Sequence, residues 1–134
     1  MEAKELRIGN LVNINRAHGR GEKQIKVKEI NLNYLSQLEM KCTYIEPIPI
    51  TEEWLLNFGF NKNPDNWFQI NYFTDCQISA EKMGLFINLI SNRCCVLDTD
   101  CEDASCVMTA KRIYYVHELQ NLYYTLTKTE LNYE

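Results

Sequence analysis

The chain has 134 residues, of which 46% are hydrophobic and 24% are charged, and its formal net charge at pH 7 is -4. This length suits one domain, and this composition excludes a disordered chain, a collagen-like repeat and a coiled coil. No apolar run reaches the roughly 20 residues that span a bilayer, and the first seven residues do not resemble a signal peptide. We therefore expect a single domain over residues 1–134.

Six cysteines raise the question of the redox compartment. Disulfide scaffolds are usually shorter, secreted chains with few ordinary core residues, whereas this chain has long apolar stretches that can fold without bridges. Adjacent cysteines in a strand point to opposite faces, which makes a shared partner difficult. We expect reduced thiols and a cytoplasmic protein. The cysteines are Cys42, Cys76, Cys94, Cys95, Cys101 and Cys106.

Charge is distributed unevenly along the chain. Residues 1–28 carry seven basic and three acidic side chains, whereas the remainder carries seven basic and fifteen acidic ones. Such an acidic bulk suits contact with a basic protein surface, and it is equally compatible with an ordinary solvated exterior. It disfavours tight, sequence-independent nucleic-acid binding, because that needs many basic side chains to neutralise phosphates.

The first third of the chain predicts short strands. Residues 5–14 alternate apolar and polar positions around a Gly-Asn pair, which favours a strand interrupted by a bulge or turn. Residues 24–30 alternate cleanly as a second strand. The glycine-containing basic stretch over residues 15–23 predicts the loop of an antiparallel hairpin. A further strand is expected near residues 40–45.

A short helix is predicted over residues 52–58. The preceding Pro47-Ile48-Pro49 ends any strand, because proline cannot donate a ladder hydrogen bond. Thr51 can cap the first turn, where two glutamates also favour the positive end of the helix dipole. Gly59 supplies the left-handed residue of a Schellman closure. The side chains expected to be buried by this helix are Trp54, Leu55 and Phe58.

The rest of the chain predicts a β-rich meander followed by a longer helix. The expected strands cover residues 67–73, about 76–79, 84–90, 94–98 and 107–113. Residues 115–127 place apolar side chains at spacings of three and four, which predicts an amphipathic helix. The expected fold is α+β: an antiparallel twisted sheet with a short central helix and a C-terminal amphipathic helix packed on it.

No pattern indicates catalysis or a resident metal. The cysteines over residues 94–106 lack the spacing of zinc knuckles and have no histidine near them. The acidic run over residues 98–103 lacks the glycine and the final glutamate of a calcium loop. His117 is expected in a first helical turn, where the dipole opposes the imidazolium form and a structural hydrogen bond is the common role. We expect no catalytic residue, no metal and no cofactor, and hence no enzyme.

Two charged stretches are candidate partner contacts. Acidic groups at the rim of an interface chiefly affect the rate of association, and a basic loop can contact RNA phosphates or an acidic patch. The candidate acidic residues are Asp98, Asp100, Glu102 and Asp103, and the candidate basic residues are Arg16, Arg20 and Lys23.

Three segments carry a resemblance to a known family: residues 5–10 (ELRIGN), 48–60 (IPITEEWLLNFGF) and 115–123 (YVHELQNLY). Together they resemble a family of small proteins encoded by phages and prophages of the Bacteroidetes group. Residues 76–106 depart from the family's pattern. In our interpretation the three segments are architectural: a bulged strand, a capped helix and a docking helix.

The resemblance implies a mobile-element origin and a role against host defence. On that basis we expect a non-enzymatic interaction protein that binds and inhibits a bacterial defence nuclease. Such a protein would resemble the anti-CRISPR proteins directed at RNA-targeting, single-protein type VI effectors. The expected partner is such an effector with its guide RNA, and no contact with a membrane is expected. The expected location is the cytoplasm of the bacterial host. Two alternatives stay open: a nucleic-acid-binding accessory protein of phage development, and a structural phage component.

Overall fold

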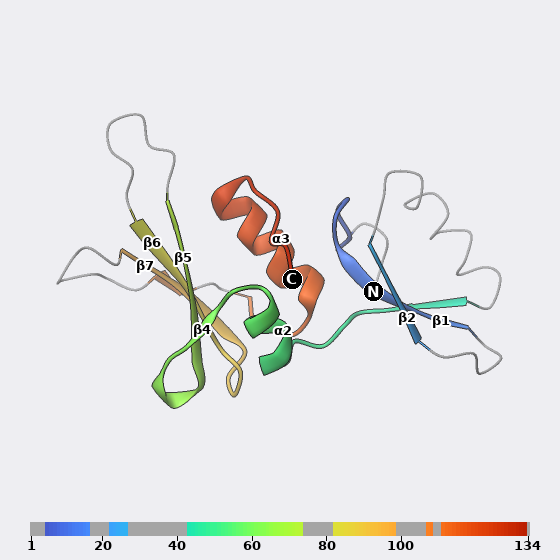
Figure 1. Ribbon diagram of the computed structural model, residues 1–134, viewed down its shortest axis with the longest axis horizontal. Helices are drawn as coiled ribbons and strands as arrows, with labels where there is room; N and C mark the ends of the chain where they lie inside the picture. The colour runs from blue at the N-terminus through green and yellow to red at the C-terminus, as the bar shows by residue number, and fades with distance from the viewer. Residues whose placement is uncertain are drawn as a thin grey trace. The chain divides into compact units, whose positions relative to one another are not determined.

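The computed structural model describes residues 5–16, 22–26, 43–73, 82–98, 107–108 and 111–133, whose elements are shown in Figure 1. The chain divides into two compact units. Unit 1 comprises Met1–Pro49 and Tyr115–Asn121, and unit 2 comprises Ile50–Tyr114 and Leu122–Glu134. The boundary therefore crosses helix α3 (Val116–Thr127), whose first half belongs to unit 1 and whose second half belongs to unit 2. That the 134 residues form a single domain stays a prediction.

Unit 1 contains a three-stranded antiparallel sheet. Its central strand β1 (Leu11–Arg16) pairs with β2 (Glu22–Lys26) on one side and with β3 (Thr43–Glu46) on the other. The register places Ile14 opposite Lys23 in β2. The expected hairpin and the strand expected near residues 40–45 are thus confirmed. Residues 17–21 of the hairpin loop lie outside the described residues.

Side-chain amides fasten the turn before β1 to the start of α3. Gln120 accepts a hydrogen bond from the Leu11 N–H at 2.8 Å and donates one to the Gly9 carbonyl at 3.3 Å. The Asn10 side chain donates to the Asn121 side chain at 2.9 Å. Because Gln120 is only 2% exposed, these bonds satisfy polar groups that are shielded from water. The segments ELRIGN and YVHELQNLY therefore meet in unit 1 and hold each other in place.

Replacing Gln120 by alanine is expected to lower the free energy of unfolding by about 1–3 kcal/mol, because it leaves the buried Leu11 N–H without its acceptor. Chemical denaturation followed by circular dichroism measures the change. The control is Asn132→Ala, which removes an exposed amide and should change stability by less than about 0.5 kcal/mol. Equal effects of the two substitutions would contradict this account of the amide contacts.

Unit 2 contains a five-stranded antiparallel sheet in the order β4-β5-β6-β7-β8. Its central strands are β5 (Trp67–Phe73), with the bounds expected from the sequence, β6 (Lys82–Asn88) and β7 (Arg93–Asp98). Two-residue strands, β4 (Asn61–Lys62) and β8 (Val107–Met108), lie at the two edges. The strand expected at residues 76–79 lies outside the described residues. One face carries fully buried side chains that form the core of the unit: Phe68, Leu85, Ile87 and Cys94.

The α+β class and the antiparallel pairing are confirmed, but the strands form two sheets where we expected one. The reason lies in residues 47–49. Two prolines follow β3 directly, and since neither can donate a ladder hydrogen bond, the pairing of the first sheet ends there. The second sheet then begins with its own strands after α2 (Glu52–Asn57).

Two expected strand ends are wrong. β6 ends at Asn88, two residues early, because the Asn88 side-chain oxygen accepts hydrogen bonds from the backbone N–H groups of Ile90 at 2.9 Å and Ser91 at 3.0 Å. An asparagine that bonds its own backbone two and three residues ahead forms a turn instead of continuing a ladder. The strand expected over residues 107–113 also ends early. Ile113 lies outside any strand, and its N–H donates to the Asn92 carbonyl at 2.8 Å.

Helix α3 begins at Val116 and ends at Thr127, one residue shorter than expected at its start. Its buried stripe includes two polar side chains, His117 and Gln120, besides the expected Val116 and Leu119. His117 is stacked on the Tyr115 ring with centroids 5.9 Å apart. Within the described residues, no helix is long and apolar enough to cross a membrane.

Tyr72 gives unit 2 a dependence on alkaline pH. Burial raises the pKa of Tyr72 above its ordinary value, and Tyr123, whose ring centroid lies 6.5 Å away, raises it further. The folded state therefore holds the proton more tightly than the unfolded state does. The resulting stability is complete below about pH 10, the pKa of an unfolded tyrosine, and is lost as the pH rises from there through the higher pKa of the folded state.

We expect Tyr72→Phe to lose less stability than the unaltered chain between about pH 9 and about pH 11, because phenylalanine has no proton to lose. Denaturation midpoints measured across this range compare the two proteins. Parallel pH profiles would show that Tyr72 does not contribute to the alkaline loss.

Candidate functional site

The residues proposed from the sequence as partner contacts fall in both units. Arg16 ends β1 and Lys23 lies within β2, so the structure brings these two positions into one sheet of unit 1. Asp98 ends β7 in unit 2. The other candidates lie outside the described residues: Arg20, Asp100, Glu102 and Asp103. Their role in partner binding stays a prediction.

Helix α2 presents an acidic and partly apolar face to solvent. Thr51 caps its start, with the side-chain oxygen 3.4 Å from the Trp54 N–H, as expected. Leu55 and Phe58 are buried and hold the helix on unit 2. On a helix, positions three and four apart share a face. The opposite face therefore presents a run of exposed side chains: Glu52, Glu53, Leu56 and Asn57.

A Schellman closure fixes the end of α2. The Phe60 N–H donates to the Leu55 carbonyl and the Gly59 N–H donates to the Leu56 carbonyl, each at 3.0 Å. Gly59 has a φ of 87°, a left-handed conformation that glycine adopts without strain. This closure was expected from the sequence and is confirmed. It gives the exposed face of α2 a fixed shape.

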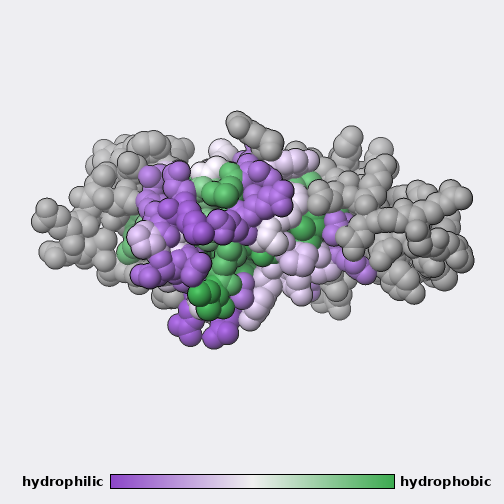
Figure 2. Space-filling view, turned by 60° about the horizontal axis from the view of Figure 1, so that its bottom comes forward, coloured by the Kyte–Doolittle hydropathy of each residue, from purple (hydrophilic) through white to green (hydrophobic). Residues whose placement is uncertain are grey.

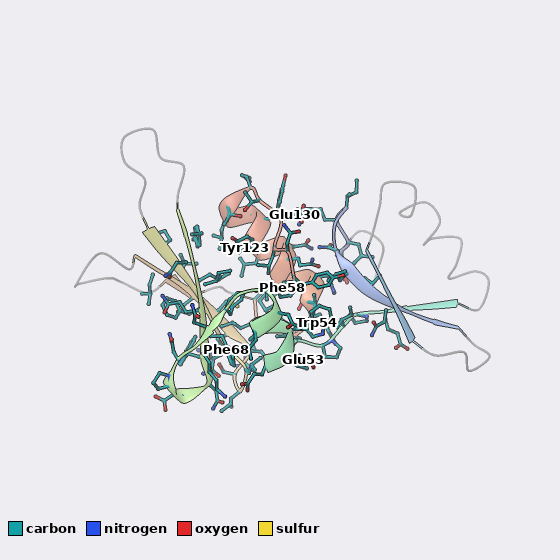
Figure 3. The ribbon with its side chains drawn as sticks, in the orientation of Figure 1. Glu53, Trp54, Phe58, Phe68, Tyr123 and Glu130 are labelled. Atoms are coloured by element: carbon teal, nitrogen blue, oxygen red, sulfur yellow. The ribbon has the colours of Figure 1, made fainter. Side chains whose placement is uncertain are left out.

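The C-terminal tail packs an aromatic ring against this helix. After α3 the chain turns at Lys128, which has a φ of 58°, and Leu131 is buried. Tyr133 then lies edge-on to Trp54, with centroids 5.9 Å apart, and to Phe58, at 6.4 Å. Tyr133 is 51% exposed. Figure 3 shows Trp54 and Phe58 side by side on α2, with Glu53 close to Trp54.

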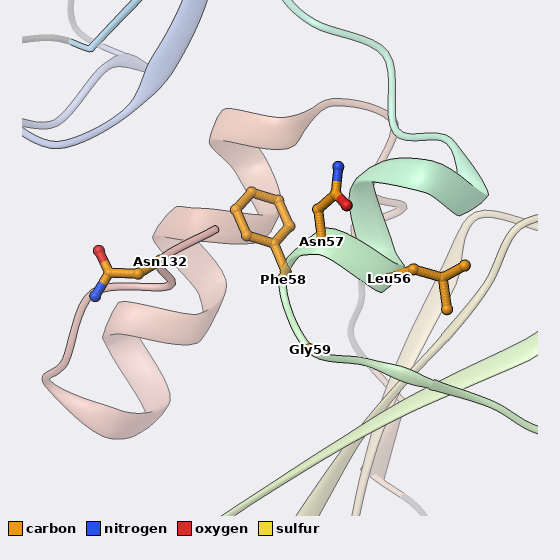
Figure 4. A pocket seen from close by; sticks show the side chains of 5 residues that line it. All are labelled: Leu56, Asn57, Phe58, Gly59 and Asn132. Carbon is orange, nitrogen blue, oxygen red and sulfur yellow. The ribbon is translucent and has the colours of Figure 1, made fainter. Parts of the chain in front are cut away.

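We call the exposed and half-buried side chains of α2 and of the tail in unit 2 the α2–tail patch: Glu52, Glu53, Trp54, Leu56, Asn57, Asn132 and Tyr133. A shallow hollow of about 290 Å³ opens within it, lined by Leu56–Gly59 and Asn132 (Figure 4). The lining combines amide groups with one exposed leucine and one phenylalanine. Figure 2 shows that on the face it displays, apolar side chains emerge between hydrophilic ones.

The α2–tail patch carries negative charge. Glu52 forms an ion pair with Lys62 at 3.0 Å, and both side chains are about half exposed, so this pair contributes little to stability. Glu53 is exposed and makes no ion pair with any of the described residues. Its carboxylate is therefore available to a positively charged partner.

A second hollow lies on the face of the five-stranded sheet that is turned away from the core. The alternation of strand side chains places Trp67, Phe86, Cys95 and Leu97 on this face. Together with Asn63 and Pro64 they line a mostly apolar hollow of about 330 Å³. Cys95 is 5% exposed at its base, and three half-buried side chains form its walls: Trp67, Phe86 and Leu97.

Among the described residues no group of three or more histidine, cysteine, aspartate or glutamate side chains could hold a metal ion. Cys94 and Cys95 are thiols and are not joined in a disulfide. Cys101 and Cys106 lie outside the described residues, so the expectation of reduced thiols without a metal stays a prediction for the cluster as a whole.

Comparison with known proteins adds no assignment: no family model, no curated protein and no solved structure matches the chain.

Sequence reasoning missed the α2–tail patch, although it placed α2 correctly. Trp54 was expected to be buried, but the structure shows it half-buried, with its ring edge-on to Tyr133 from the tail. The two residues are far apart in the chain, and nothing local connects them. The one available signal was the Glu52-Glu53-x-x-Leu56 spacing, which places carboxylates and a leucine on the solvent face of a short amphipathic helix.

Proposed function

We propose that this chain is a non-enzymatic binding protein that inhibits a bacterial defence nuclease by occupying a basic, RNA-binding surface of that nuclease. The observation that carries the proposal is the α2–tail patch, in which two exposed carboxylates lie on the same short helix as the half-buried Trp54, next to the exposed ring of Tyr133. Aromatic side chains near the centre of an interface supply much of the binding energy. Carboxylates facing a basic partner accelerate association.

The patch is complementary to an RNA-binding surface in two chemical respects. A carboxylate can take the place of a phosphate opposite lysine or arginine, and Glu53 offers one. An aromatic ring can take the place of a base opposite a stacking side chain. Tyr133 and Trp54 offer two rings, with centroids 5.9 Å apart. An acidic protein with this arrangement competes for a nucleic-acid site and is itself repelled by bare nucleic acid.

The class of nuclease follows from the resemblance of residues 5–10, 48–60 and 115–123 to phage and prophage proteins. We propose a type VI RNA-targeting effector with its guide RNA as the partner. The setting is then the cytoplasm of the bacterial host, where the effector acts. The basic positions Arg16, Arg20 and Lys23 are proposed as a second contact, to the guide RNA or to an acidic patch of the effector.

A cleavage assay with a purified effector and its guide RNA tests the proposal. Adding the unaltered chain should inhibit cleavage of the target RNA. We expect Glu53→Arg to raise the concentration needed for half inhibition about tenfold, mainly through slower association, because it reverses the charge that faces the basic partner. The matched control is Glu5→Arg, an equal change of charge at an exposed position of unit 1, which should leave inhibition nearly unchanged.

Three outcomes would contradict the proposal. One is the absence of inhibition at saturating protein. Another is an equal loss with Glu53→Arg and Glu5→Arg, which would assign the effect to net charge alone. The third is tight binding to bare RNA with a steep salt dependence, lost on Arg16→Ala with Arg20→Ala; that result would favour a nucleic-acid-binding accessory protein instead.

A further inference from the structure

A basic side chain of the protein itself occupies one carboxylate of the α2–tail patch. Lys62 belongs to the edge strand β4, and its Nζ lies 3.0 Å from Glu52 Oε1 and 3.1 Å from Glu52 Oε2. One ammonium group therefore donates to both oxygens of the carboxylate. Glu52 thus holds a cation already in the free protein.

Fixed elements on both sides bring this pair together. The register of β4 and β5 places Lys62 opposite Phe68, and the Lys62 Nζ lies 5.9 Å from the centroid of the Phe68 ring. A cation at this distance over a ring is attracted by the electrons of the ring face. Glu52 is the first residue of α2, directly after the Thr51 cap. The cation therefore lies between a carboxylate of the helix and an aromatic ring of the sheet.

The pair is easily opened. Both side chains are about half exposed, and exposed ion pairs are weak because water competes for the charges. Displacing Lys62 therefore reduces the affinity of an incoming cation at most about fivefold. A guanidinium group binds a carboxylate through two parallel N–H···O bonds, whereas an ammonium group acts as a point charge. An arginine consequently gains more from Glu52 than Lys62 does.

We propose that Glu52 is the contact for an arginine side chain of the partner, and that Lys62 occupies this contact until the partner displaces it. The inference rests on the proposed function, because it takes the partner to be basic. Lys62 lowers the affinity for such a partner, since it must be displaced and its charge repels other cations. It also favours partners with arginine, because a lysine of the partner only replaces one ammonium by another.

An NMR titration with a hexa-arginine peptide tests this chemistry without the effector, in about 0.1 M salt, where charges more than about 10 Å apart are largely screened. We expect Lys62→Gln to bind the peptide about fivefold more tightly than the unaltered chain, with shifts centred on residues 51–57. The matched control is Arg112→Gln, which removes the same charge from an exposed side chain outside the patch and should change the affinity less than about twofold. A hexalysine peptide should bind the unaltered chain about threefold more weakly than hexa-arginine.

A double-mutant cycle shows whether Lys62 acts through Glu52. In a Glu52→Gln background, the gain from Lys62→Gln should shrink to less than about twofold, because no carboxylate is left to be opened. The proposal would be overturned by no gain with Lys62→Gln, by an equal gain with Arg112→Gln, by a gain that persists in Glu52→Gln, or by equal binding of the two peptides.

The cleavage assay with the effector separates this inference from the proposed function. If the unaltered chain fails to inhibit the effector while the peptide cycle gives the expected result, the proposed function is wrong and the arginine contact at Glu52 stands. If the chain inhibits the effector and the cycle shows no coupling between Lys62 and Glu52, the arginine contact alone is wrong.

Discussion

Replacing Phe68 by alanine is expected to lower the free energy of unfolding by about 3–5 kcal/mol, the largest effect on stability expected from any single substitution considered for this chain. Phe68 is fully buried in β5 and lies opposite Ile87, which is also fully buried. Removing its ring leaves a cavity among side chains that the strands hold in place. Since small proteins are stable by only about 5–15 kcal/mol, this substitution consumes much of the available stability.

Chemical denaturation followed by tryptophan fluorescence reports this loss, because both tryptophans, Trp54 and Trp67, belong to unit 2. Leu56→Ala provides the control: the side chain is 48% exposed, and its removal should change stability by less than about 0.5 kcal/mol. A loss for Phe68→Ala that is no larger than the loss for Leu56→Ala would contradict the placement of the core on this face of the sheet.

Replacing Tyr133 by alanine is expected to weaken binding to the proposed effector about thirtyfold, the effect typical of losing an aromatic residue at the centre of an interface. The ring is 51% exposed, so it is accessible to a partner. Its edge-on contacts with Trp54 and Phe58 hold it in one orientation. A preoriented ring pays less conformational entropy on binding than a freely rotating one.

Tyr114→Ala is the matched control for this change, because Tyr114 is similarly exposed, at 46%, but lies outside the α2–tail patch. Titration calorimetry with the effector and its guide RNA gives the dissociation constants of both variants. Circular dichroism of the free variants shows whether either has lost structure. Similar affinities for Tyr133→Ala and the unaltered chain would show that Tyr133 is not part of the interface.

Local signals in the sequence predicted elements of this fold well. Thr51 and Gly59 mark the two ends of α2, and the structure confirms both the cap and the Schellman closure. The alternation over residues 67–73 gave the bounds of β5 correctly. In each case the signal and the structure it specifies lie within a few residues of each other, so backbone sterics and local hydrogen bonds decide the outcome.

Features that depend on distant parts of the chain were not predictable in the same way. The division into two sheets depends on which strands pair, and the amide contacts of Gln120 join residues 109 and 111 positions apart in sequence. The α2–tail patch likewise needs Tyr133 to return to Trp54. Composition indicated an acidic exterior in general terms, but which residues form the α2–tail patch follows from this tertiary packing.

Hydrogen exchange of the chain, free and bound to the effector with its guide RNA, tests most directly whether it acts by covering an RNA-binding surface through the α2–tail patch. Exposed amides of a short helix and a terminal tail exchange quickly in the free protein, so protection on binding is readily seen there. We predict slower exchange over residues 52–58 and 129–133 in the complex. Unchanged exchange in both segments, with protection confined to other parts of the chain, would contradict the account.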